Sequence, residues 1–419
     1  MEGVCNEITH PLLENNLESN KDYPKQGHTS FFKTFFNGLN ALSGVGILSV
    51  PYALASGGWL SLVLIFTVAL AAFYAGILIK RCMEADTTIK SYPDIGERAF
   101  GNVGRRVVSL FMCIELYLVV TGFLILEGDN LSNLFPTLEF EAYGVTFGGR
   151  DTFVVIVALI ILPTVLLDNL SILSYFSATG VVASLVILAS ILWVGAFEGV
   201  GFKSKGELLN LSGVPTAVSL YSFCYCAHPV FPTLYNSMKQ RQHFSKILLL
   251  CFLSSTISYA TMAIFGYLMF GPKVNSQITL NLPTNKLSSK VAIYTTLINP
   301  LSKYALMLEP VATAADSWFP DYRKKRHFRV LIRTALVTTQ VIVAILVPFF
   351  GSLMSLVGAF LSVTASITLP CLCYLKISGA NLRFEKVLVV GTIVISMLIA
   401  IFGTYTALVQ LIQGTVLRY

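Results

Sequence analysis

The feature that most constrains the fold of this chain is a break inside an apolar stretch. Residues 31–56 are long and apolar enough to cross a bilayer, but the run LSGVGILSVP at 42–51 interrupts them. Glycine is conformationally permissive and proline lacks an amide donor, so both weaken a continuous helix. At membrane depth, freed backbone groups are tolerated only where protein buries them or where they line a cavity. The break therefore predicts a place where backbone meets something polar.

A second apolar segment, residues 213–236, is interrupted in a similar way by CAHPVFP at 226–232. Both breaks run from small residues through an apolar pair to proline. Two interrupted segments in corresponding positions are the best sequence indication of a secondary-transporter site. Each break opens a group of five spans, and an odd number forces the two groups into opposite orientations. We therefore expect inverted repeats with a binding site between them.

Composition indicates a chain that lies mostly within the bilayer. Hydrophobic residues make up 55% of it and charged residues only 12%, against roughly 25% charged residues in soluble domains. We expect an all-α membrane protein with a disordered tail over 1–30, one transporter domain over 31–415 with repeats at about 31–197 and 213–375, and an extra helix at 386–415. A window of about 20 residues predicts eleven spans, at 31–56, 58–81, 106–127, 152–168, 171–197, 213–236, 244–270, 289–317, 330–347, 350–375 and 386–415.

The distribution of basic residues predicts the orientation. With the N-terminus in the cytosol, 21 of the 29 lysines and arginines fall on cytosolic segments, 7 fall on the far side, and Lys303 lies within a span. This imbalance favours a cytosolic N-terminus and an odd number of spans. It also explains the basic cluster at 323–329 as a short cytosolic loop, so we expect no nucleic-acid partner. The sequons at Asn130 and Asn210 would lie on the far side.

Several separate segments resemble one known family. The run NALSGVGILSVPYAL at 40–54 resembles the first span of the amino acid/auxin permease family, and YPDIGERAFG at 92–101 resembles the loop after its second span. The runs LILEGDNL at 124–131 and NPLSKYA at 299–305, with the segment around His228, are similar to its vacuolar amino-acid transporter branch in plants and fungi. The resemblance implies a LeuT-like fold of 5 + 5 inverted repeats plus one helix. It also implies proton-coupled movement of neutral amino acids.

A broken span can meet both ends of an amino acid, which is a zwitterion. A helix N-terminus presents free N–H groups and a partial positive charge, whereas a helix C-terminus presents free carbonyl groups. We expect carboxylate recognition, mostly by backbone N–H groups, at Ser43, Gly44, Val45 and Gly46. A Gly-x-Gly notch for helix packing is the alternative. Carbonyl groups over 221–225 are expected to bind the ammonium, with a side-chain pocket shaped by Ser222, Phe223 and Tyr225.

His228 is one of five histidines and the only one inside a predicted span. The ordinary pKa of a histidine, about 6.5, lies near the working range of an acidic compartment. Because His228 sits in the second break, we expect it to face an aqueous cavity and to take part in proton coupling or substrate contact. The alternative is a histidine that only forms a hydrogen bond with the broken backbone.

Lys303 lies in the middle of the eighth span, with Asn299 one turn earlier. A lysine at this depth is costly unless it faces the bundle interior and pairs, so we expect a partner such as Glu115 or a carbonyl group. The resemblance implies that sodium-coupled relatives bind sodium between the first and eighth helices, where the Lys303 ammonium would replace the ion. Glu115 is also a candidate proton carrier, and Tyr117 is a candidate wall of the site unless it only packs.

The leading hypothesis is a proton-coupled transporter of neutral amino acids in the vacuolar membrane; a plasma-membrane amino-acid or auxin permease is the alternative. The expected partners are the amino acid and the lipid bilayer. No cofactor besides the proton is expected, and no metal, because Cys224/Cys226 and Cys371/Cys373 lack zinc-site geometry. An enzyme is disfavoured because the spans carry neither HExxH nor a GxGD aspartate pair. The sequence leaves open which amino acid moves, and whether protons move with it or against it.

Overall fold

The computed structural model describes residues 29–136, 140–142, 145–147, 149–166, 176–317, 325–378 and 383–418. The predicted tail, apart from its last two residues, lies outside this part of the chain. The described residues are helical except for a short antiparallel hairpin of β1 (Phe140–Ala142) and β2 (Val145–Phe147). The predicted all-α class is confirmed, with the hairpin as a small addition that the sequence did not reveal.

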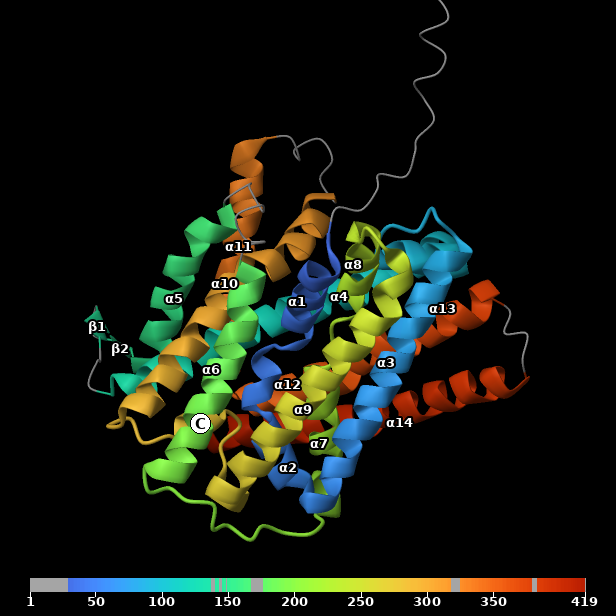
Figure 1. Cartoon of the computed structure of the whole chain (residues 1–419). Helices are drawn as coiled ribbons and strands as arrows, with labels where there is room; N and C mark the ends of the chain where they lie inside the picture. Colours follow the sequence, from blue (N-terminus) through green and yellow to red (C-terminus); the bar gives the residue numbers. More distant parts are fainter. Residues whose placement is uncertain are drawn as a thin grey trace, which may run out of the picture.

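The first five predicted spans correspond to α1 (Phe31–Leu42) with α2 (Val50–Gly57), α3 (Leu62–Ala85), α4 (Tyr92–Leu134), α5 (Gly149–Leu166) and α6 (Phe176–Phe197), shown in Figure 1. The helix α4 begins earlier than predicted because Ser91 and Asp94 form a capping box and Pro93 lies in the first turn. It kinks at Phe100 and Gly101, where Gly101 adopts a φ of 64° that glycine tolerates best.

The next five predicted spans correspond to α7 (Val214–Cys224) with α8 (Phe231–Ser237), α9 (Phe244–Phe270), α10 (Leu287–Ser317), α11 (Arg326–Leu346), and α12 (Phe350–Leu356) with α13 (Leu369–Ser378). Turns of π-helix over 357–368 join α12 to α13. The last helix, α14 (Arg383–Arg418), packs against α7 and α12. Both predicted breaks are confirmed, one between α1 and α2 and one between α7 and α8.

In the described part of the chain, eight helical segments are long and apolar enough to cross a membrane unaided. The broken segments α1–α2 and α7–α8 are not among them, and α10 carries Asn299, Pro300 and Lys303 in its middle. Together with these three, the structure accommodates the eleven predicted spans. Only 17% of the apolar window in α14 is buried in protein, against 72% in the α12–α13 segment. The extra helix is therefore peripheral, whereas α1 and α2 lie in the middle of the bundle (Figure 1).

Candidate functional site

The first break places Gly44 beside open space. The helix α1 ends at Leu42, Gly44 is extended (φ −102°, ψ −161°), and a 3₁₀ turn, η1 (Val45–Leu48), leads towards α2. From Leu42 to Val50, a stretch that the structure describes completely, only Gly44 is not buried. A Cβ on Gly44 would meet no atom within 4 Å. The first N–H groups of η1 lack an acceptor within their own helix, so Gly44 adjoins both free space and backbone donors.

Gly46 has a different environment, although it lies only two residues further on. A Cβ added to Gly46 would lie 2.7 Å from the Cys224 sulfur and 3.2 Å from the Cys224 Cα. The two breaks are therefore in close contact at this point, and only glycine allows it. The Gly-x-Gly pattern was open to two interpretations, a notch for helix packing and a site for the substrate's carboxylate. Gly46 fits the packing notch, whereas the free space that a ligand needs lies at Gly44.

Lys303 extends from α10 to the C-terminal end of α1. Its ammonium donates hydrogen bonds to the carbonyl oxygens of Asn40 and Ser43, each at 3.0 Å, and the residue is 9% exposed. These carbonyls lie at the C-terminal end of α1, where no further N–H group of the helix donates to them and where its partial negative charge is found. Two kinds of partner were expected for Lys303, Glu115 or a carbonyl group, and the structure shows backbone carbonyl groups.

Glu115 lies elsewhere, on α4, and its Oε1 accepts a hydrogen bond of 2.6 Å from the Ser362 hydroxyl. It is 2% exposed, and the predicted pair with Lys303 is not formed. Asn299 is buried on α10, one turn before Lys303, as predicted. Within the described residues, no group of three or more His, Cys, Asp or Glu side chains is placed to hold a metal ion.

His228 is enclosed by protein, contrary to the expectation that it faces water. Its Nε2 lies 2.8 Å from the carbonyl oxygen of Ala72 on α3, and its exposure is 0%. Its ring packs on Phe231, with centroids 4.7 Å apart, and lies near Phe252. The sequence located His228 in the break correctly, but the break turns this side chain towards α3 and α9.

The side chains expected to shape the pocket are engaged with their surroundings. The Ser222 hydroxyl donates to the Val218 carbonyl of its own helix at 2.8 Å. Tyr225 is 1% exposed, and its hydroxyl lies 2.8 Å from that of Thr256 on α9. Phe223 is buried, and its Cβ lies 3.0 Å from where a Cβ on Gly358 would be. In this structure all three serve helix packing, so their role in a pocket stays a prediction.

Tyr117 was expected at the wall of the site, but it points elsewhere. Its hydroxyl donates to the Thr339 hydroxyl on α11 at 3.0 Å. Its backbone carbonyl accepts a hydrogen bond from the Gln340 amide, also on α11, at 3.4 Å. Because Tyr117 and Glu115 are two residues apart on one helix, they project in different directions. Tyr117 therefore belongs to the contact between α4 and α11 and not to the space at the breaks.

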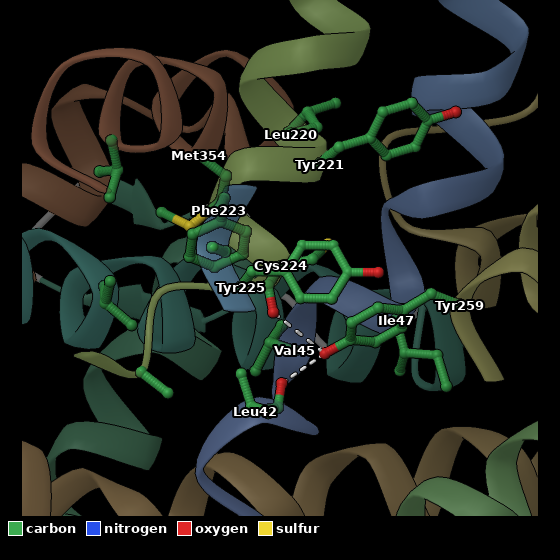
Figure 2. Packing of buried hydrophobic residues seen from close by; sticks show 14 of the residues in the cluster. Leu42, Val45, Ile47, Leu220, Tyr221, Phe223, Cys224, Tyr225, Tyr259 and Met354 are labelled. Carbon is green, nitrogen blue, oxygen red and sulfur yellow. Dashed lines mark hydrogen bonds between the residues drawn. The ribbon is translucent and has the colours of Figure 1, made fainter. Parts of the chain in front are cut away.

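Tyr259 on α9 joins the two breaks and was missed in the sequence (Figure 2). Its hydroxyl donates to the Leu42 carbonyl at the end of α1 and lies 3.3 Å from the Cys224 carbonyl at the end of α7. The Leu42 carbonyl also accepts the Gly44 N–H at 2.8 Å. The Tyr259 side chain is 1% exposed and packs edge-on against Tyr225. The last carbonyl groups of both broken helices therefore converge on one point.

A cavity of about 840 Å³ opens on the α2 side of the bundle. It is lined by Tyr52 of α2, the end of α4, residues 274–284 and the start of α12. At its edge, Asp129 accepts hydrogen bonds from Arg150 at 2.6 Å and from Gln277 at 2.7 Å. The Asn130 amide donates to Gln277 at 2.8 Å and is fully buried, so this sequon is not accessible for glycosylation in the folded protein.

On the α1 side, the two broken segments are joined by hydrogen bonds. The Thr29 amide donates to the Ser237 carbonyl at 2.9 Å, and the Lys239 amide donates to the Thr29 carbonyl at 3.1 Å. The Thr29 hydroxyl adds a bond of 2.7 Å to the same Ser237 carbonyl. The bundle is thus hollow on the α2 side and tied together on the α1 side.

Helical spans with two breaks, whose backbone groups meet inside the bundle, define a multi-pass membrane transporter of the LeuT-like class. The chain belongs to the transmembrane amino acid transporter protein family, which it matches over residues 27–409. It is 61% identical over 408 residues to the amino acid transporter AVT1J of Arabidopsis thaliana, covering 96% of both chains. It is 57% identical over 404 residues to AVT1I of the same plant, covering 96% of this chain and 99% of the relative. The family consists of transporters and not of enzymes.

Two solved structures confirm the fold. MhsT, crystallised with L-phenylalanine, superposes with a TM-score of 0.58 at 13% identity, covering 91% of this chain and 100% of MhsT. A sodium-coupled sialic acid symporter superposes with a TM-score of 0.53 at 12% identity, covering 92% of both chains. At such low identity the likeness concerns the fold, and the predicted LeuT-like arrangement is thereby confirmed.

Proposed function

We propose that this protein is a secondary active transporter that moves neutral amino acids across the vacuolar membrane, driven by a proton gradient. The observation that carries the proposal is the convergence of the broken helices, with carbonyl groups of Leu42 and Cys224 at one point and open space with backbone donors at Gly44. Carbonyls suit an ammonium and helix N-termini suit a carboxylate, so a zwitterion matches both. The curated relatives are named amino acid transporters, which supports the same class.

Neutral substrates are favoured by the charges at the breaks. Residues 42–51 and 221–232 contain no aspartate or glutamate. A cationic side chain bound there would lose its hydration without gaining an acidic partner from the breaks themselves, which is costly at low dielectric. The hollow α2 side and the closed α1 side fit one state of a carrier that exposes its site to one face of the membrane at a time.

Proton coupling is favoured over sodium coupling by Lys303. Its ammonium already bonds the Asn40 and Ser43 carbonyls between α1 and α10, where a bound cation would need such oxygens. A second cation at the same carbonyls would meet strong repulsion. We place Lys303 first among the coupling groups, with Asn299 beside it, and Glu115 second. His228, bonded to Ala72, would contribute only if α3 and the second break separate during the cycle.

The vacuolar membrane and a cytosolic N-terminus are part of the proposal. They rest on the resemblance of 124–131 and 299–305 to the vacuolar branch and on the excess of basic residues on one side. The alternative is a plasma-membrane permease for amino acids or auxin. A fluorescent fusion expressed in plant cells separates them, because the proposal requires a signal on the vacuolar membrane and a signal at the cell surface contradicts it.

The transport activity itself is tested by counterflow. Purified protein in proteoliposomes would be loaded with one of a panel of unlabelled amino acids and presented with the labelled compound, with and without a pH gradient, in sodium or in choline buffer. We expect saturable counterflow for neutral amino acids, a response of net uptake to the pH gradient, and no effect of replacing sodium. Absence of counterflow for the whole panel would refute the proposal, and a requirement for sodium would refute its coupling ion.

A further inference from the structure

One hydroxyl lies where two helix ends need more donors than it can supply. The Tyr259 hydroxyl contacts the carbonyl oxygens of both Leu42 and Cys224 (Figure 2). A hydroxyl carries a single proton, so it can donate to only one of the two at a time, whereas an ammonium carries three donors. The bond to Leu42 is the close one, and Cys224 at 3.3 Å is left with the weaker contact.

We propose that Tyr259 occupies the position of the substrate's ammonium in the empty carrier, and that the bound amino acid displaces its hydroxyl. The inference rests on the proposed function and assigns to α9 a residue that competes with substrate. The hydroxyl oxygen lies at the point where the Leu42 and Cys224 carbonyls converge, so an ammonium that bonds both carbonyls cannot share that point with it. The exchange replaces one donor by three at the negative ends of α1 and α7.

The competition has a consequence for the transport cycle. During exchange, the carrier crosses the membrane loaded in both directions, and the ammonium joins α1 to α7 each time. During net transport the carrier must return empty, and the Tyr259 hydroxyl then makes the connection between the same carbonyls. Without the hydroxyl, the Leu42 carbonyl of the empty carrier keeps only the Gly44 N–H and the Cys224 carbonyl loses its contact with Tyr259, whereas in the loaded carrier the ammonium supplies both carbonyls. Loss of the hydroxyl therefore favours binding and hinders the empty return.

The test uses Tyr259→Phe in the full-length protein, reconstituted in proteoliposomes. Its control is Tyr267→Phe on the same helix, whose hydroxyl instead accepts the Glu207 amide at 2.8 Å, away from both breaks. Both variants keep their rings. For Tyr259→Phe we expect a half-saturation constant in counterflow lowered about fivefold, the equivalent of one net hydrogen bond, with counterflow rate retained and net uptake into empty vesicles reduced several-fold. For Tyr267→Phe we expect the wild-type ratio of net uptake to exchange.

The outcomes separate this inference from the function on which it rests. Suppose that the wild-type protein exchanges amino acids. If Tyr259→Phe then has unchanged affinity, or loses exchange and net uptake equally, the inference alone is overturned. Weaker binding by Tyr259→Phe also overturns it, because the hydroxyl would then assist the ammonium. A wild-type protein that neither binds nor exchanges any amino acid overturns the proposed function and the inference together. If Tyr259→Phe does not reach the membrane, Tyr259→His, which keeps a ring but moves the donor, must show the same loss of net uptake relative to exchange.

Discussion

The two glycines of the first break should respond differently to the same small substitution. In Gly46→Ala, the new methyl would lie 2.7 Å from the Cys224 sulfur and 3.2 Å from its Cα. The sulfur can move by rotation, but the Cα belongs to the backbone of α7, so the two breaks must separate. Overpacking of this kind costs about 1–3 kcal/mol of unfolding free energy. We expect Gly46→Ala to unfold at a lower temperature and to transport poorly.

Gly44→Ala should leave stability nearly unchanged but impair binding. Its methyl would meet no atom within 4 Å, and a φ of −102° is allowed for alanine. If the substrate's carboxylate approaches this backbone, however, the methyl occupies ligand space. One extra carbon in a fitted pocket changes binding by about 1–3 kcal/mol, so the half-saturation constant should rise at least about fivefold.

The measurements are thermal unfolding of purified protein in detergent and counterflow in proteoliposomes. Gly391→Ala on α14 is the matched control, because a Cβ there also meets nothing within 4 Å, but at the periphery of the bundle. The control should be stable and active. Normal counterflow by Gly44→Ala would refute the placement of the ligand, and wild-type stability of Gly46→Ala would refute the close contact between the breaks.

Three further substitutions test separate contacts. Lys303→Met leaves the Asn40 and Ser43 carbonyls without their buried donor, which costs about 1–3 kcal/mol of stability for each carbonyl. Amino-acid uptake by this variant should lose its response to a pH gradient. A retained response would exclude Lys303 from coupling. His228→Gln should keep the proton dependence of uptake, because the ring is enclosed against α3, and a lost dependence would restore His228 as a coupling group. Thr29→Ala removes a side-chain hydrogen bond between the broken segments, which is worth about 1 kcal/mol. Hydrogen exchange of the amides at the start of α1 should therefore become about fivefold faster. Unchanged exchange would show that the backbone hydrogen bonds alone close this side.

The breaks and spans were predictable because their signals are local. Gly44, Gly46 and Pro51 lie within eight residues, and each disfavours a continuous helix whatever surrounds it. Hydropathy likewise placed the spans within a few residues, except for α4, which begins at Tyr92 instead of 106 and ends at Leu134 instead of 127. There the capping box at Ser91 extends the helix into a polar stretch that a hydropathy window passes over.

The directions of side chains within the site were not predictable. The need of Lys303 for a partner follows from burial alone, but its acceptors at Asn40 and Ser43 lie some 260 residues earlier in the chain. The expectations that His228 faces water and that Tyr117 lines the site differ from the structure. The sequence carries no information on which face of a break, or of α4, meets which neighbouring helix. Tyr259 lies in the run SSTISYAT at 254–261, where nothing in the sequence sets it apart from the other hydroxyl side chains, and only the folded bundle brings its hydroxyl to two helix ends.

The central claim is that this protein couples amino-acid movement to protons without sodium. It is tested most directly by loading proteoliposomes with a pH-sensitive dye, adding a neutral amino acid that supports counterflow in sodium-free buffer, and recording internal pH. The account predicts a pH change that saturates with amino-acid concentration and is absent when Lys303 is replaced by methionine. Amino-acid uptake without any pH change, or uptake only after sodium is added, would contradict it.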